Sequence, residues 1–222
     1  MEKIACITGA SSGIGRETAL VLAENGYKLI LCGRRKDRLE SLQKEISVDS
    51  TILIFDVRDL GQVQSSFASL SEDWKNIDVL INNAGNAHGL SPIQDGDVAD
   101  WDAMMHGNVN GLLYVSKSVI PLMIARKSGH IINISSIAGK QIYANGAVYC
   151  ASKAAVEVLS QGMRIDLNPF GIKVSNLAPG AVNTEFSAVR FKGDADKVDA
   201  VYKGFEPLVA KDVAEVLRFM VM

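Results

Sequence analysis

The glycine-rich segment TGASSGIG, residues 8–15, joins an apolar run from Ile4 to Ile7 to a helical pattern from Glu17 to Glu24. The three glycines at positions 9, 13 and 15 can adopt backbone angles closed to other residues, and they let a phosphate approach the amides at a helix N-terminus. A strand, loop and helix of this kind is typical of dinucleotide-binding sheets, although the glycine spacing differs from the GxGxxG form. The alternative is a tight turn without a ligand.

Five further apolar runs follow this segment, and helical patterns separate them. The runs span Lys28 to Cys32, Thr51 to Phe55, Asp78 to Ile81, Ile131 to Ile134 and Ile172 to Leu177. Strands that alternate with helices predict an α/β fold, a Rossmann-like doubly wound parallel sheet with helices on both faces, as a single domain over residues 1–222. Each run ends in small or polar residues, on the edge where such sheets bind ligands.

The residues after the second strand bear on the choice of dinucleotide. In these folds an acidic side chain at this place accepts from the ribose, whereas arginine accommodates a 2′-phosphate. No acid stands at Cys32 or Gly33, and Arg34 and Arg35 follow with guanidinium groups that suit phosphate. The sequence therefore favours NADP(H) over NAD(H). The alternative is a solvated basic start to the helix from Asp37 to Ile46.

A helical pattern from about Val148 to Leu167 begins with Tyr149-Cys150-Ala151-Ser152-Lys153. Tyr149 and Lys153 are four residues apart and share a helix face. An ammonium about 4 Å from a phenolate could lower the tyrosine pKa by roughly three units, towards the range useful for acid–base catalysis. We therefore expect Lys153 to lower the pKa of Tyr149; the alternative is a pair that only covers the helix surface.

Two other segments break the regular pattern. The long helical pattern from Trp101 to about Ala125 contains Gly107-Asn108-Val109-Asn110-Gly111, which predicts a kink or a local function. Residues 185–207 are polar and charged with scattered aromatics, which suits a lid over the ligand edge. An amphipathic helix then begins at Asp212.

Composition narrows the function further. The 222 residues are 48% hydrophobic and 22% charged with a net charge of −2, which gives no reason to expect a nucleic acid or membrane partner. Three scattered cysteines show no metal spacing and indicate reduced thiols, and the short first apolar run does not suit a signal peptide. We expect a cytoplasmic protein without a bound metal.

Taken together the motifs resemble the classical short-chain dehydrogenases/reductases over essentially the whole length. The resemblance rests on the glycine segment, Asn82-Asn83-Ala84-Gly85, Ser136, Tyr149 with Lys153, and Pro179-Gly180, in the family's order and approximate spacing. It implies that Tyr149 is the acid/base, that Ser136 binds the substrate oxygen, and that Lys153 lowers the tyrosine pKa and holds the nicotinamide ribose. Asn108 would hold a water in a proton relay.

The resemblance also implies a set of cofactor contacts that spreads over the strand ends. Besides Tyr149 and Lys153 they are Gly9, Ser11, Ser12, Gly13, Ile14, Gly15, Arg34, Arg35, Asp56, Val57, Asn83, Ala84, Gly85, Pro179, Gly180, Val182 and Thr184.

Within the family the chain is most similar to NADP-dependent 3-hydroxy acid (serine) dehydrogenases, through Gly33-Arg34-Arg35 and the segment 184–194. This implies a small hydroxy acid or carbonyl substrate, with Arg190 or Lys192 pairing with a carboxylate unless Glu185 and nearby aspartates neutralise them. The alternatives are a reductase of 3-oxoacyl thioesters or other carbonyls, and a non-catalytic NADP(H)-binding sensor or scaffold.

The family also sets expectations about assembly. Its members usually form tetramers or dimers through the long helices, so we expect a homotetramer or homodimer. They continue into a seventh strand, whereas this sequence stops within the preceding helix, so we expect it to be the ordered part of a longer chain.

Overall fold

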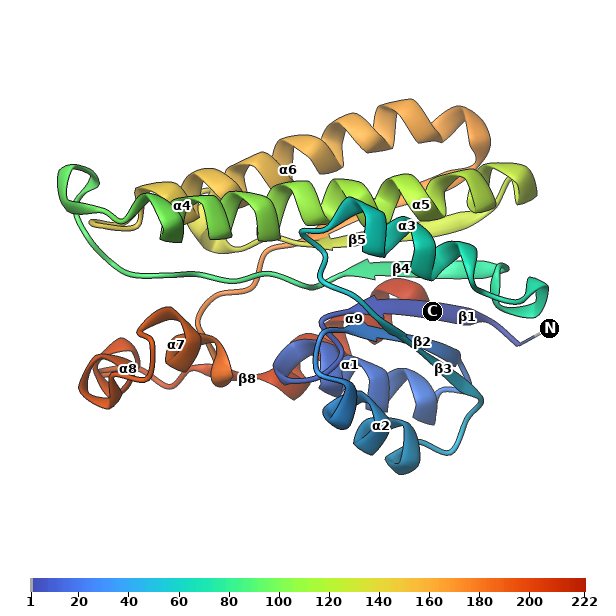
Figure 1. The fold of residues 1–222 in the computed structure, drawn as a ribbon, viewed down its shortest axis with the longest axis horizontal. Helices are drawn as coiled ribbons and strands as arrows, with labels where there is room; N and C mark the ends of the chain where they lie inside the picture. Colours follow the sequence, from blue (N-terminus) through green and yellow to red (C-terminus); the bar gives the residue numbers. More distant parts are fainter. Residues whose placement is uncertain (1) are drawn as a thin grey trace.

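The computed structural model describes residues 2–222 and contains a six-stranded parallel sheet in the order β3-β2-β1-β4-β5-β6 (Figure 1). The order runs outwards from β1 in one direction and from β4 in the other, which is the predicted doubly wound topology. The strands are β1 (Ile4–Thr8), β2 (Lys28–Gly33), β3 (Ser50–Ile54), β4 (Ile77–Asn82), β5 (Gly129–Ile134) and β6 (Ile172–Leu177). All six predicted strands are confirmed to within two residues at each end.

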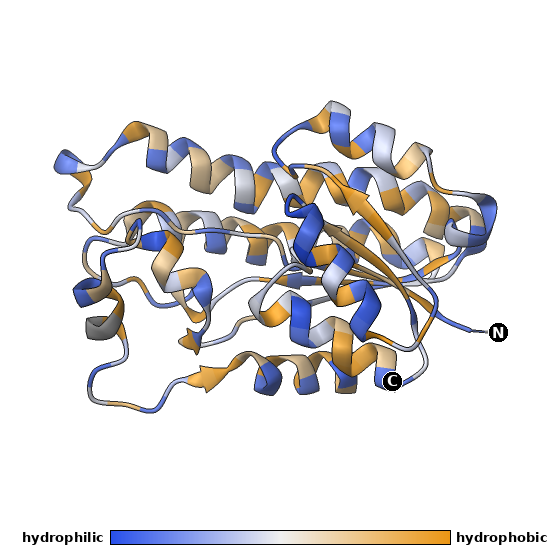
Figure 2. Ribbon diagram, turned by 60° about the horizontal axis from the view of Figure 1, so that its bottom comes forward, coloured by the Kyte–Doolittle hydropathy of each residue, from blue (hydrophilic) through white to orange (hydrophobic). Residues whose placement is uncertain are grey.

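Helices cover both faces of the sheet (Figure 1). One face packs against α1 (Gly13–Glu24), α2 (Lys36–Glu45) and α9 (Ala210–Val221). The other packs against α3 (Leu60–Ala68), α5 (Gly111–Arg126) and α6 (Ala147–Leu167). Alternate strand residues point to opposite faces, so β1 and β2 are buried along almost their whole length, as a sheet covered on both sides requires (Figure 2).

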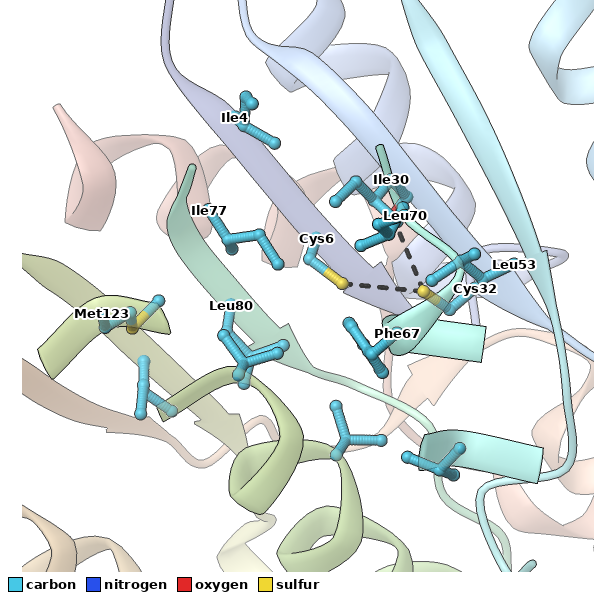
Figure 3. Close-up of a cluster of buried hydrophobic side chains, with 14 of the residues drawn as sticks. Ile4, Cys6, Ile30, Cys32, Leu53, Phe67, Leu70, Ile77, Leu80 and Met123 are labelled. Carbon is cyan, nitrogen blue, oxygen red and sulfur yellow. Dashed lines mark hydrogen bonds between the residues drawn. The ribbon is translucent and has the colours of Figure 1, made fainter. Parts of the chain in front are cut away.

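The core beneath α3 and α5 contains two cysteines. Cys6 of β1 and Cys32 of β2 are fully buried with their sulfur atoms 3.6 Å apart, among Ile30, Leu80 and Phe67 (Figure 3). Burial raises the pKa of the Cys32 thiol well above its usual range, so this thiol stays protonated. These residues act as small core side chains.

The predicted break in the long helix is confirmed as a π-helical turn. α4 (Val98–Met105) ends in the turn His106–Asn110, and α5 continues from Gly111. A Cβ atom at Gly107 would lie 2.6 Å from Asn86 Nδ2, and one at Gly111 2.8 Å from Val57. The two glycines therefore let the helix approach the strand-end loops, and the turn buries Asn108.

The segment predicted as a lid is mostly helical. It contains α7 (Glu185–Arg190) and α8 (Ala195–Val201), which Figure 1 shows at the end of the molecule farthest from the N-terminus. A two-stranded parallel ribbon of β7 (Val182–Asn183) and β8 (Leu208–Val209) joins it to the main body. Short 3-10 turns occur at Glu72–Trp74, Ile93–Asp95, Ile137–Gly139 and Asn168–Phe170.

Gly15 lies where α1 packs closely against the loop that follows β1. A Cβ atom there would overlap the Gly9 carbonyl oxygen and lie 2.5 Å from Asn83 Nδ2. Gly15→Ala should therefore destabilise the fold by ~1–3 kcal/mol, because overpacking moves backbone that cannot yield. The matched control is Gly162→Ala in α6, where no atom lies within 4 Å of the new Cβ.

Thermal unfolding of both variants checks this prediction. The Gly15 variant should lose ~2–4 °C for each kcal/mol, whereas the Gly162 variant should gain ~0.5–1 kcal/mol from helix propensity. Equal melting temperatures for the two variants would contradict the packing role of Gly15.

Candidate active site

A cavity of about 810 Å³ lies at the carboxyl ends of the strands and runs from the glycine loop to the lid. This volume falls within the ~300–1,000 Å³ typical of small-molecule and cofactor sites. The predicted residues lining it are Gly9, Ser11, Ser12, Gly13, Ile14, Arg34, Arg35, Asp56, Val57, Asn83, Ala84, Gly85, Ser136, Tyr149, Lys153, Pro179, Gly180, Val182, Thr184 and Arg190. The structure thus brings together all the predicted site residues except Gly15, Asn108 and Lys192, the alternative to Arg190.

The glycine loop forms one wall of the cavity. Gly9 and Gly13 have φ angles of 69° and 52°, which side chains rarely adopt. A Cβ atom at Gly13 would lie 3.3 Å from Thr184, so a side chain there would fill the space between the loop and the far wall. The loop and the first turn of α1 leave a cradle that fits the phosphates of a dinucleotide.

Asn83 and Thr8 hold this loop in place. The Asn83 amide donates to the Thr8 carbonyl oxygen at 2.9 Å, and the Thr8 hydroxyl oxygen accepts the N–H groups of Asn83 and Ala84 at 3.0 Å. The side-chain amide of Asn83 therefore holds the loop in place, and the residue also lines the cavity.

Arginines line the end of the cavity that fits the adenosine ribose. Arg35 donates to the hydroxyls of Ser11 and Ser12 at 3.0 and 2.6 Å, and its other nitrogen lies 2.9 Å from Glu185 of the lid. Glu185 also pairs with Arg38 at 2.6 Å. Sequence reasoning missed Arg38 and the part played by Glu185, which lies 150 residues from Arg35.

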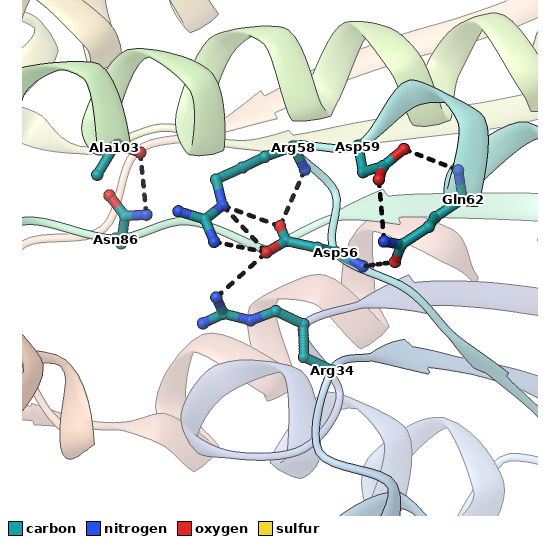
Figure 4. A network of polar contacts seen from close by, with 7 residues as sticks. All are labelled: Arg34, Asp56, Arg58, Asp59, Gln62, Asn86 and Ala103. Carbon is teal, nitrogen blue, oxygen red and sulfur yellow. Dashed lines mark hydrogen bonds and ion pairs between the residues drawn. The ribbon is translucent and has the colours of Figure 1, made fainter. Parts of the chain in front are cut away.

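Asp56 anchors a second cluster at this end (Figure 4). Arg58 contacts it through its backbone and guanidinium groups, and Arg34 lies 3.4 Å away. Burial alone would raise the pKa of Asp56, but the hydrogen bonds from Arg58 lower it to about 2, so it is a carboxylate at neutral pH. Four guanidinium groups thus face two carboxylates, which leaves positive charge for an anion.

Ser136, Tyr149 and Lys153 meet at the end of β5. Lys153 donates from Nζ to the Ile134 carbonyl oxygen at 3.0 Å and is buried. Tyr149 is 9% exposed and lies one helical turn earlier, and the neighbouring Ser136 side chain acts to lower its pKa. Asn108 lies behind them: its amide oxygen accepts the Asn86 N–H at 2.7 Å, and its amide nitrogen donates to the Asn86 carbonyl oxygen at 2.8 Å.

The expectation that Lys153 lowers the pKa of Tyr149 is wrong for the protein without ligand. Burial is the largest influence and raises the pKa of Tyr149 to about 12, against the lowering effect of the Ser136 hydrogen bond. Burial also lowers the pKa of Lys153 to about 8. The physical reason is that both charged forms lose water, while the ammonium group bonds to Ile134 rather than to the phenol.

Arg190 reaches into the cavity from the lid. Its guanidinium carbon lies 5.5 Å from the centre of the Tyr149 ring and 5.4 Å from that of Tyr143, and Nε donates to the Gly89 carbonyl oxygen at 3.2 Å. Among the side chains that the structure describes, residues 2–198 and 201–222, no carboxylate forms an ion pair with Arg190. Lys192, the other candidate, instead pairs with Asp100 at 3.0 Å and does not line the cavity.

No group of metal-ligating side chains is found among the residues that the structure describes. The same part of the chain contains no helix that is long and apolar enough to cross a membrane.

Comparison with known proteins decides the family. The model of the short chain dehydrogenase family matches residues 3–195. The chain belongs to this family. It is 42% identical over 213 residues to the NADP-dependent 3-hydroxy acid dehydrogenase YdfG of Escherichia coli K12, which covers 96% of this chain and 86% of that protein.

Two further proteins are similar to this chain over nearly its whole length. Sulfoacetaldehyde reductase 2 of Chromohalobacter salexigens is 43% identical over 222 residues, which cover 99% of this chain and 88% of that protein. The solved closed form of serine dehydrogenase complexed with NADP+ superposes with a TM-score of 0.95 at 41% identity, over 97% of this chain and 88% of that one.

The buried ammonium group of Lys153 makes stability depend on pH. The unfolded chain holds this proton up to about 10.5 and the folded protein only up to about 8, so the stability of the wild type should rise with pH across that window. Lys153→Met removes the buried charge. It should raise the free energy of unfolding by ~2 kcal/mol near pH 7, after allowance for the lost hydrogen bond, and by less than ~1 kcal/mol near pH 10.

Urea unfolding at the two pH values measures this difference. Lys140→Met is the control, because that side chain is 62% exposed and its removal should leave both stabilities unchanged. A Lys153 variant with the same effect at both pH values would contradict burial as the cause.

Proposed function

We propose that this protein is an NADP(H)-dependent oxidoreductase that interconverts a small 3-hydroxy acid, such as serine or 3-hydroxyisobutyrate, and the corresponding carbonyl compound. The observation that carries the proposal is one cavity that joins a phosphate cradle with arginines to Ser136 and the buried pair Tyr149 and Lys153. The relatives that are NADP-dependent 3-hydroxy acid dehydrogenases support both the cofactor and the reaction class.

The glycine loop and Ser11 and Ser12 hold the cofactor's phosphates, and Arg34 and Arg35 hold the 2′-phosphate. The strand-end residues Asp56, Val57 and Asn83 to Gly85 line the adenosine and ribose part, and Pro179 to Thr184 line the nicotinamide part. The bound cofactor supplies or accepts the hydride. The chain's own residues position the substrate and manage its proton.

Ser136 donates a hydrogen bond to the substrate oxygen, and Tyr149 transfers the proton to or from it. With a pKa of about 12 in the free protein, Tyr149 is a neutral phenol at neutral pH and therefore a proton donor, which suits carbonyl reduction. Lys153 holds the ribose hydroxyls, and its charge favours the phenolate when the proton has left. Asn108 fixes the loop at Asn86, next to Lys153.

Arg190 is the substrate's anchor in this proposal. This guanidinium group lies above the Tyr149 ring and has no acidic partner among the described side chains, so it can pair with a carboxylate two bonds from the reacting carbon. A sulfonate offers the same charge and oxygen acceptors, and the similarity to a sulfoacetaldehyde reductase supports sulfoacetaldehyde as the second candidate substrate.

Assembly and location complete the proposal. Val158 and Ile165 on the outer side of α6 are 67% and 75% exposed, which supports association of two or four copies through the long helices. Three free cysteines, all buried, fit a reducing cytoplasm.

The test follows NADPH absorbance with NADP+ and, in parallel, NAD+, using L-serine and 3-hydroxyisobutyrate, and in reverse with NADPH and sulfoacetaldehyde. Turnover should require the 2′-phosphorylated cofactor and fall by ~100-fold or more in Tyr149→Phe, because the proton donor is lost. Tight NADPH binding with no turnover on any compound, 3-oxoacyl thioesters included, would instead indicate a non-catalytic binder.

Arg190→Ala should raise KM for the anionic substrate by ~10–100-fold, the worth of a charge-assisted hydrogen bond, and leave KM for an uncharged ketone within ~3-fold. Lys192→Ala is the matched control, because this neighbouring cation pairs with Asp100 outside the cavity. Equal effects of Arg190→Ala on both substrates would contradict the anchor role.

A further inference from the structure

Glu157 extends the row of functional side chains on α6 by one turn. Tyr149, Lys153 and Glu157 are spaced by four residues, so they lie on one face of the helix. The Glu157 side chain is 16% exposed and points to the ends of β5 and β6. Its Oε1 atom accepts a hydrogen bond from the Ser135 hydroxyl and another from Asn176 Nδ2 at 2.5 Å.

The carboxylate determines how the Ser135 hydroxyl is oriented. A carboxylate only accepts hydrogen bonds, so the single hydroxyl proton of Ser135 points to Glu157. The lone pairs of the same oxygen are then free to accept the backbone N–H of Ser136 at 2.5 Å and the Asn176 amide at 3.3 Å. Glu157 is therefore linked to the backbone N–H of Ser136 through a single intermediate atom, Ser135 Oγ.

Two adjacent turns of α6 thus hold consecutive residues at the end of β5. Lys153 binds the carbonyl oxygen of Ile134, and Glu157 binds the side chain of Ser135. Ser136 follows directly, with its own side chain accepting the Ala138 N–H at 3.1 Å. Since Tyr149 projects from the same helix, the two contacts fix the distance between Ser136 and the phenol.

We infer that Glu157 is a positioning residue of the active site, which acts through Ser135 to hold Ser136 against Tyr149. The inference rests on the proposed function of Ser136 and Tyr149. If the only role of this residue were to hold α6 against the sheet, an apolar side chain would serve better. A largely buried carboxylate loses its hydration, which costs free energy that an apolar side chain does not lose. The hydrogen-bonding carboxylate supplies direction, which packing alone does not.

Glu157→Ala tests the inference, with Glu157→Gln as the conservative variant. The alanine variant should lower kcat by ~10-fold and leave KM for NADPH within ~2-fold, because a small misplacement of a reacting group is costly. The glutamine oxygen accepts the same two hydrogen bonds, so this variant should keep kcat within ~3-fold of the wild type. Lys140→Ala is the control, since its ammonium lies 3.9 Å from the other carboxylate oxygen and is exposed.

Amide hydrogen exchange provides a readout that does not need turnover. The Ser136 amide should exchange ~10-fold faster in Glu157→Ala and in Ser135→Ala, and at the wild-type rate in Lys140→Ala. Ser135→Ala also serves if the Glu157 variant fails to fold, because it removes the intermediate oxygen alone.

Each outcome decides one claim. A lower melting temperature for the alanine variants, with unchanged kcat and unchanged Ser136 exchange, would overturn the inference and leave a structural role. If the wild type turns over no substrate, the proposed function fails, whereas Ser136 exchange still decides whether Glu157 positions that residue.

Discussion

The buried hydrogen bond from Lys153 to the Ile134 carbonyl oxygen constrains the rest of the site. An ammonium group that is 6% exposed must have a partner in a fixed place, so the end of β5 and the register of α6 are set together. The turn after β5 fits only because position 139 is glycine, where a Cβ atom would lie 2.8 Å from the Lys153 carbonyl carbon. This contact therefore also fixes the positions of Tyr149 and Glu157, which lie one turn before and one turn after Lys153 on α6.

The two halves of the cavity meet through the lid. At one end Glu185 pairs with Arg35 and Arg38, and at the other Arg190 and Gly89 exchange two hydrogen bonds, from the Gly89 N–H at 2.9 Å and from Nε at 3.2 Å. Phe186 packs on the Tyr149 ring between them, with ring centres 5.8 Å apart. One short helix, α7, therefore contacts Arg35, Arg38 and Tyr149 and also carries Arg190.

Much of the fold and the site could be predicted from the sequence, because these features follow from local sequence patterns. Continuous apolar runs predicted the six strands, and the glycines within a helical pattern predicted the break at Asn108. Gly15 packs α1 against the loop and does not line the cavity, so its expected contact with the cofactor stays a prediction. The sequence did not show the contacts of Arg38, Glu185 and Glu157, because their partners come from other elements of the fold.

The pKa values could not be predicted from spacing for the same reason. The spacing of Tyr149 and Lys153 predicts that they share a helix face, but only the fold shows that both are desolvated and that the ammonium group bonds elsewhere. The central claim is thus that burial governs this pair in the free protein. NMR titration of the protein with ¹³C-labelled lysine tests it most directly: one ε-carbon, absent from the Lys153→Met spectrum, should titrate at about 8. If instead Lys153 titrates near 10.5 with the exposed lysines, the account is contradicted.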